Sequence, residues 1–159
     1  MTVLDTNFLI DLLRNKAGIS EAADSLKDPK TTAINAFELY YGARRSAKPE
    51  KAVLEVSNLL NSIDVLEFDH SAAQKAGDIH ANLMNSGNPI DIMDVLIAGI
   101  VLANKEELMT RDIEHFDRIK GLRCRTRQGN FDTYRASLIS IYRWQACRDF
   151  PLSMGVVQI

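Results

Sequence analysis

The sequence predicts an α/β domain in which a central parallel sheet is flanked by helices on both faces. Short β-prone runs alternate with helix-like apolar patterns from residue 2 to residue 126, which is the order expected of such a sheet. The 159 residues fit one domain and can bury a core without disulfides or a structural metal. Apolar residues make up 46% and charged residues 25%, an ordinary globular composition that sets global disorder aside.

Each expected strand is a short run rich in β-branched or other apolar side chains. The expected strands are residues 2–4, 31–34, 63–68, 107–110 and 121–126. The first of these ends directly at Asp5, and the dipeptide Asp28-Pro29 signals a loop ahead of the second.

Each expected helix has apolar residues at the spacing of one helical face. The expected helices are residues 8–13, 36–45, 49–60, 70–84 and 92–102. Pro49 suits the first turn of its helix, and the run 86–89 breaks the pattern before the last one. That last helix is apolar on all sides, which predicts burial between layers or in a contact between subunits.

We divide the chain into a domain over residues 1–128 and a C-terminal extension over residues 129–159. The extension contains the only tryptophan, Trp144, and a second helix-like spacing of aromatic and aliphatic residues. A docking helix, an oligomer element and a loosely held tail all fit this composition, so its role stays open.

The net charge of −2 gives no overall attraction to nucleic acid, so any surface that binds it must be local. Two groups of basic residues are candidates for such a surface. They are Arg44, Arg45 and Lys48 in one group, and Arg118, Lys120, Arg123, Arg125 and Arg127 in the other. A solvated helix or loop face explains each group, taken alone, equally well.

Cysteine usage and hydropathy predict where the protein is found. Cys124 and Cys147 have no metal-ligand spacing, which favours two reduced thiols in a cytosolic protein. Asp5 interrupts the N-terminus before a signal peptide can build, and the apolar run 95–103 is well short of the ~20 residues that span a bilayer. We therefore expect a soluble, cytoplasmic protein with no membrane partner.

Four carboxylates are expected at one edge of the sheet. In parallel α/β sheets, ligands bind outside the carboxyl ends of the strands. Asp5 and Asp112 follow two of the expected strands, and Glu38 lies in the first turns of the helix after another. Asp94 begins the apolar helix. Four acids from four distant segments can therefore converge at one place.

Like charges gathered in one site oppose their own ionisation, and a hard divalent cation removes that cost. Since no His or Cys accompanies the acids at ligand spacing, Mg²⁺ or Mn²⁺ is favoured over Zn²⁺. Such an ion can activate a water and neutralise a leaving oxygen, which is the chemistry of phosphodiester hydrolysis. Thr6, Asn7 and Thr110 are expected to orient carboxylates or waters beside it.

Each acid also has a purely structural interpretation. Asp5 can cap the first helix. Asp91 can cap the apolar helix, which places Asp94 in its first turn, where the helix dipole favours a negative charge. Glu38 can be a solvated helix acid, and Asp112 can cap a short segment after it. These interpretations explain the acids one by one but not their common place at the sheet edge.

Several segments, in this order, resemble PIN-domain proteins, and within that family most closely the VapC-type toxins of toxin–antitoxin pairs. The resemblance covers residues 1–126. The segments are Val3-Leu4-Asp5-Thr6-Asn7, Phe37-Glu38-Leu39-Tyr40-Tyr41-Gly42-Ala43, Asp94-Val95-Leu96-Ile97-Ala98, and Met109-Thr110-Arg111-Asp112-Ile113-Glu114-His115-Phe116.

The resemblance implies a PIN fold and a metal-dependent endoribonuclease that acts on RNA. It also implies a homodimer and a cognate antitoxin that blocks the acidic groove. The four family acids match Asp5, Glu38, Asp94 and Asp112, with Asp5, Asp94 and Asp112 as the metal ligands. Asp91 is an additional acid one turn before Asp94, which can assist the metal or only cap. The extension has no counterpart in the resemblance.

Two other classes of function are kept as alternatives. In an aspartyl phosphatase, Asp5 would be the nucleophile, but the D-x-D pattern of such enzymes has Asn7 in place of its second acid here. In a non-catalytic binding module, the same acids would only recognise a partner. Metal-dependent cleavage of RNA separates the nuclease from both alternatives.

Overall fold

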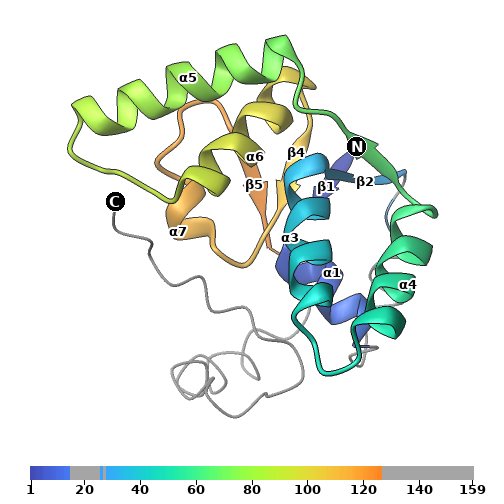
Figure 1. Cartoon of the computed structure of the whole chain (residues 1–159). Helices are drawn as coiled ribbons and strands as arrows, with labels where there is room; N and C mark the ends of the chain where they lie inside the picture. Colours follow the sequence, from blue (N-terminus) through green and yellow to red (C-terminus); the bar gives the residue numbers. More distant parts are fainter. Residues whose placement is uncertain (15–25, 27, 127–159) are drawn as a thin grey trace, which may run out of the picture.

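A five-stranded, fully parallel sheet forms the centre of the protein (Figure 1). The computed structural model describes residues 1–14, 26 and 28–126. Along the sheet the strands follow the order β3-β2-β1-β4-β5, so the first strand of the chain lies in the middle. The strands are β1 (Thr2–Leu4), β2 (Pro29–Thr32), β3 (Asp64–Leu66), β4 (Glu107–Met109) and β5 (Arg123–Arg125).

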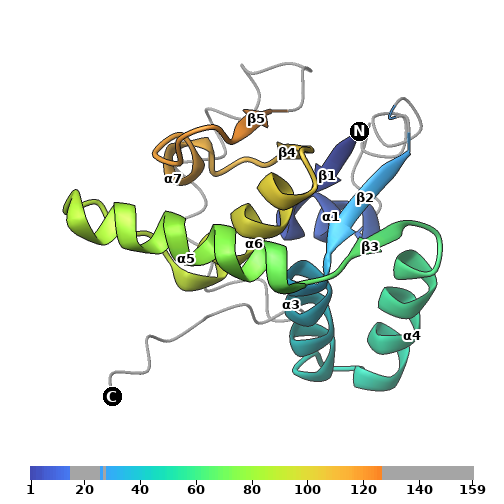
Figure 2. The ribbon, with the colours of Figure 1, turned by 90° about the horizontal axis from the view of Figure 1, so that it is seen from above.

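Six helices within the described residues cover both faces of this sheet, as the sequence predicts. They are α1 (Thr6–Leu13), α3 (Ala33–Arg44), α4 (Pro49–Leu60), α5 (His70–Asn85), α6 (Ile92–Ala103) and α7 (Ile113–Phe116). The turned view shows α5, α6 and α7 grouped apart from α3 and α4 (Figure 2).

Strand alternation divides the core between the two faces. Val3 and Leu108 point into a cluster with side chains of α5, α6 and α7, while Leu4 and Met109 point into a cluster with α1, α3 and α4. Successive strand residues face opposite sides, so the three-residue strands β1 and β4 contribute to both clusters.

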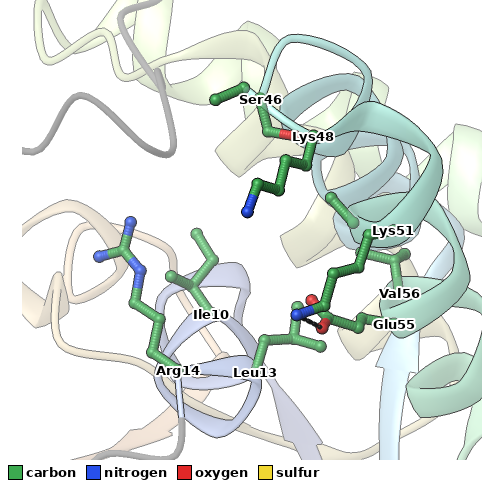
Figure 3. Close-up of a pocket in the computed structure, with 10 residues that line it drawn as sticks. Ile10, Leu13, Arg14, Ser46, Lys48, Lys51, Glu55 and Val56 are labelled. Atoms are coloured by element: carbon green, nitrogen blue, oxygen red, sulfur yellow. Dashed lines mark ion pairs between the residues drawn. The ribbon is translucent and has the colours of Figure 1, made fainter.

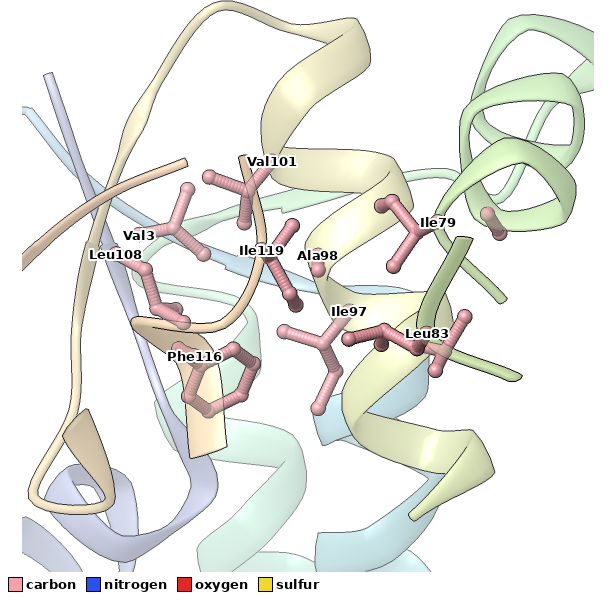
Figure 4. Packing of buried hydrophobic residues seen from close by; sticks show 11 residues of the cluster. Val3, Ile79, Leu83, Ile97, Ala98, Val101, Leu108, Phe116 and Ile119 are labelled. Carbon is pink, nitrogen blue, oxygen red and sulfur yellow. The ribbon is translucent and has the colours of Figure 1, made fainter. Parts of the chain in front are cut away.

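Helix α6 is the buried layer between α5 and the sheet. Ile97, Ala98 and Val101 are at most 1% exposed, and they pack against Ile79 and Leu83 of α5 and against strand residues (Figure 4). The interpretation of this apolar run as a helix between layers is therefore confirmed. An ideal Cβ on Gly99 would lie 2.8 Å from the Ala72 carbonyl oxygen, so glycine is what lets α5 approach α6 this closely.

Most expected elements have the right type and nearly the right bounds, but β2 and α3 begin earlier than predicted. The strand expected at 31–34 is Pro29–Thr32, and the helix expected at 36–45 begins at Ala33. The Thr32 hydroxyl accepts a hydrogen bond from the Asn35 backbone N–H at 3.1 Å, and this cap starts the helix at once. Pro29 is tolerated as a first strand residue.

The strand order also determines where a ligand can bind. From β1 the chain moves to β2 and β3 on one side, and later returns to β4 and β5 on the other. The crevice of such a sheet lies at the carboxyl end of the strand where the order reverses, which here is β1. The predicted extension, residues 129–159, lies outside the described residues. Within the described ranges no helix is long and apolar enough to cross a membrane.

Candidate active site

Asp5 lies at the carboxyl end of β1 and is held by three donors. Its side chain is buried, with the residue 6% exposed. Oδ1 accepts hydrogen bonds from the Thr6 backbone N–H at 2.7 Å and from Asn35 Nδ2 at 3.2 Å. Oδ2 accepts one from the Thr110 hydroxyl at 2.7 Å. These bonds, from α1, α3 and the end of β4, fix the carboxylate at the sheet edge.

Glu38 joins this group through Thr6. The Thr6 hydroxyl donates a short hydrogen bond to Glu38 Oε2 and accepts one from Asn35 Nδ2 at 2.8 Å. Asn35 is fully buried, and the Thr32 hydroxyl donates to its side-chain oxygen at 2.6 Å. One buried amide therefore connects the first residue of α1, the end of β1 and the first turns of α3.

The remaining two acids are both less buried than Asp5. Asp94, in the first turn of α6, has Oδ2 3.2 Å from His115 Nδ1. Asp112 Oδ2 accepts a hydrogen bond from Asn7 Nδ2 at 2.9 Å, and the Asp112 backbone N–H donates to the Thr110 hydroxyl at 3.0 Å. Thr110 thus contacts both Asp5 and Asp112.

The pKa values of three of the four acids are raised. The pKa of Asp5 is raised from 3.8 to about 6, chiefly by burial; the hydrogen bonds from Thr110 and Thr6 oppose the rise, and the charges of Asp112 and Asp94 add to it. Burial raises the pKa of Glu38 from 4.5 to about 7, with Asp5 and Asp94 adding to the rise. The pKa of Asp94 is raised too, again chiefly by burial, while His115 opposes the rise. Perturbed carboxyls in one cleft are typical of functional sites.

The chemistry of these donors fits a hard divalent cation. Asp5, Asp94 and Asp112 would hold Mg²⁺ or Mn²⁺ through carboxylate oxygens, and the positive charge of the ion would favour the ionised form of these buried, neighbouring carboxyls. Within the described part of the chain, no three acidic, histidine or cysteine side chains are already drawn together as a ligand set. Asp94 and Asp112 are instead bonded to His115 and Asn7, which a bound cation would compete with.

The structure agrees with the purely structural interpretation of some of these acids and disagrees with that of others. Asp5 is indeed the N-cap of α1, and Asp91 caps α6 through a 2.8 Å bond to the Met93 N–H. Glu38 is half-buried and bonded, so it is not a freely solvated helix acid. Asp112 stands at the N-cap position of α7 but makes no side-chain cap bond.

The polar neighbours predicted to orient the acids each contact at least one of them. Thr6 bonds Glu38, Asn7 bonds Asp112, and Thr110 bonds Asp5. The sequence reasoning missed Asn35 and gave His115 no role in the site. The available signal for Asn35 was its position three residues before Glu38, on the same side of one helix.

The basic residues predicted to bind RNA lie in different environments. Arg44 is 3.8 Å from Glu50, and Arg45 lies over the Tyr41 ring, both at the end of the helix that carries Glu38. Arg123 begins β5 and donates to the Lys105 carbonyl at 3.4 Å, so it lies at the opposite, amino-terminal edge of the sheet. The exposed residues Arg118 and Lys120 lie in the segment that leads there from α7.

A cavity of about 340 Å³ lies apart from the four acids, between the end of α1 and helix α4 (Figure 3). Ile10 and Leu13 contribute apolar surface, while Arg14, Lys48 and Lys51 contribute positive charge. None of the four candidate acids lines it, so it is a feature separate from the candidate active site.

Comparison with known proteins agrees with this geometry. Residues 2–122 match the PIN domain. Proteins of Shigella flexneri and Salmonella typhimurium named tRNA(fMet)-specific endonuclease VapC are each 32% identical over 123 residues, covering 76% of this chain and 93% of the relative. The solved DNA-bound VapBC of Salmonella typhimurium superposes with a TM-score of 0.74 at 31% identity, covering 79% of this chain and 96% of that one. VapBC-1 of Haemophilus influenzae superposes at 0.71 and 27%, with the same coverage.

The chain therefore belongs to the PIN domain family. The match spans most of the described residues and includes the strands β1 to β4. Within the family its place is among the VapC proteins, because the relatives above 30% identity that it covers almost fully carry that name.

Proposed function

We propose that this protein is a metal-dependent endoribonuclease that hydrolyses RNA phosphodiester bonds as the toxin of a toxin–antitoxin pair. The observation that carries the proposal is the convergence of Asp5, Glu38, Asp94 and Asp112 at the carboxyl edge of the sheet, where burial raises the pKa values of Asp5, Glu38 and Asp94. The names of the curated relatives, which are endonucleases and ribonucleases, support it.

Each acid has a distinct part in this proposal. A bound Mg²⁺ or Mn²⁺ would supply an activated water and neutralise charge on the phosphate. Asp5 would be a metal ligand whose carboxylate is held in place by hydrogen bonds to both of its oxygens. Asp94 and Asp112 would be the other two ligands. Glu38, whose pKa is near 7, can accept the proton of the attacking water at neutral pH and release it again.

The partners of the proposed toxin follow from the relatives. Solved relatives are VapBC assemblies, described as toxin–antitoxin systems in one case, so we propose a cognate antitoxin that covers the acidic edge, and a homodimeric toxin. Two relatives are named for tRNA(fMet), which makes tRNA the first substrate to test. Loops of structured RNA present unpaired bases that a protein can read.

A cleavage assay tests this function directly. The full chain, purified without partner, is incubated with end-labelled total RNA and tRNA in Mg²⁺, Mn²⁺ or EDTA. We expect discrete fragments that require metal and are lost in Asp94→Asn. Asp91→Asn is the matched control, because asparagine also caps helices and Asp91 lies one turn away, so it keeps cleavage.

Two results would overturn the proposal. Cleavage that persists in EDTA and in Asp94→Asn would remove the acids from the chemistry. Metal binding without cleavage of either RNA pool would favour the non-catalytic binding module. An aspartyl phosphatase is not favoured, since Asn7 donates to Asp112 and leaves Asp5 without an acid partner two residues on.

A further inference from the structure

Three side chains form a continuous row on the solvent side of α3. Phe37, Tyr41 and Arg45 are spaced four residues apart, so they lie one helical turn from each other. The Phe37 and Tyr41 rings stack with centroids 6.2 Å apart and planes at 18°. The Arg45 guanidinium carbon is 5.3 Å from the Tyr41 ring centroid, and Nη1 donates to the Tyr41 hydroxyl at 2.6 Å.

The row is exposed although it is largely aromatic. Phe37 is 50% exposed and Tyr41 37%, which leaves ring surface open to solvent on the helix that carries Glu38. Contiguous exposed apolar surface marks binding sites more often than single exposed residues do. The two rings are held in place by stacking on each other and by the contact of Tyr41 with Arg45, so their ordering would not have to be supplied by a bound ligand.

The position of the row connects it to the acids. Tyr41 follows Glu38 by three residues, so the two side chains are neighbours on the surface of α3. A ligand that lies across the Tyr41 ring is therefore about one helical turn from a carboxylate of the acidic edge. Flat ring faces beside an arginine, with Arg44 next in the chain, suit bases and phosphates together.

We propose that Phe37, Tyr41 and Arg45 form a base-stacking platform that holds unpaired nucleotides of an RNA beside the four acids. The proposal rests on the proposed function and deepens it, because it selects single-stranded loops over paired stems. Every base has an aromatic face that can stack, so the platform binds a single strand without selecting its sequence.

Tyr40 provides a matched control on the same helix. It is as exposed as Tyr41, at 37%, but its hydroxyl lies 3.2 Å from Ser57 Oγ of α4, on another side of α3. If removing any exposed tyrosine of α3 weakens RNA binding, Tyr40→Leu will weaken it too. If only the row binds RNA, Tyr40→Leu will leave the affinity unchanged.

The test measures RNA binding rather than cleavage. Fluorescence anisotropy with a labelled single-stranded RNA and a labelled duplex RNA, in EDTA, gives Kd for the full chain and its variants. We expect Phe37→Leu and Tyr41→Leu to raise Kd for the single strand about 5- to 100-fold, the range of one lost stacking contact. Tyr41→Phe, which keeps the ring, restores binding, and Tyr40→Leu leaves it within about twofold.

RNA that lacks bases at the contacted positions makes the test specific. The wild-type protein binds such abasic RNA more weakly, and Tyr41→Leu causes no further loss with it. Equal losses for Tyr40→Leu and Tyr41→Leu, or an equal loss with duplex RNA, would overturn the platform. A change of oligomeric state in Tyr41→Leu, measured by light scattering, would assign the row to a subunit contact instead.

The two proposals fail separately in these experiments. If Asp94→Asn still cleaves RNA, the assigned active site is wrong whatever the anisotropy shows. If cleavage depends on Asp94 but Phe37→Leu and Tyr41→Leu bind single-stranded RNA as tightly as the wild type, the nuclease stands and the platform is wrong.

Discussion

At the residue scale, Asp5 both caps α1 and belongs to the candidate active site. It is the N-cap of α1, and it is also the buried carboxylate on which donors from three elements converge. A cap alone needs a single acceptor bond, and it gains nothing from burial. The second oxygen, bonded to Thr110, and the raised pKa are what distinguish Asp5 from an ordinary helix cap.

Glu38 gives a prediction on stability. Its pKa rises from 4.5 to about 7 on folding, so the folded chain binds this proton more tightly than the unfolded chain. The resulting stability is fully present below pH 4.5 and is lost as pH rises through 7. Glu38→Gln can still accept the Thr6 hydrogen bond but does not titrate. We expect it to exceed wild-type stability by about 1–3 kcal/mol at pH 8 and to match it at pH 4.

Urea unfolding in EDTA at pH 4, 6 and 8 measures this difference. Glu55→Gln is the control, because Glu55 is exposed on α4 beside Lys51 and far from the acids in the chain. Its effect on the free energy of unfolding should be small beside that of Glu38→Gln at pH 8. A Glu38→Gln protein whose stability tracks the wild type at all three values would show that Glu38 ionises as freely as a surface acid.

At the scale of elements, the contact between α5 and α6 depends on a glycine. In an exposed helix interior, alanine is better than glycine by about 1 kcal/mol. At Gly99 the added methyl would meet the Ala72 carbonyl and the Ala76 side chain, both at 2.8 Å, so the helices must separate. We expect Gly99→Ala to destabilise the protein by about 1–3 kcal/mol.

Gly77 in α5 is the matched control for this prediction. A Cβ there meets nothing within 4 Å, so Gly77→Ala should stabilise the protein by about 0.5–1 kcal/mol. Opposite signs for the two substitutions in chemical unfolding would support the close helix contact. A stabilising Gly99→Ala would mean that α5 is packed less tightly than described.

The elements themselves were largely predictable because their signals are local. The apolar run of α6 and the strand that ends at Asp5 are visible within a few residues. The start of α3 was not, since the Thr32 cap competes with the β-prone run on either side of it. Asn35 was missed because its partner Asp5 lies 30 positions away, and only the fold reveals that contact.

At the scale of the whole molecule, the acids should make stability depend on metal. With Asp5 and Glu38 ionised at pH 8, a cation that binds only the folded state raises the Tm in proportion to ln(1 + [metal]/Kd). At pH 5 both groups are mostly protonated, and metal must displace those protons. We expect Mn²⁺ to raise the Tm by several degrees at pH 8 and by much less at pH 5.

Thermal unfolding with and without Mn²⁺ tests this expectation. Asp94→Asn should lose most of the increase at pH 8, whereas Asp91→Asn should keep it. The same increase at both pH values, or in Asp94→Asn, would place the metal outside the four acids.

The site is also assembled from the two extremes of the described fold. Thr110 bonds Asp5, and Asp112 bonds Asn7, each across 105 positions of chain. At about 5–20 residues per second, a ribosome takes roughly 5–20 s to pass from one partner to the other. A chain that has not yet been translated as far as Asp112 therefore has no complete acidic edge. If the chain is the proposed ribonuclease, each new copy therefore cannot cleave RNA during that interval of its own synthesis.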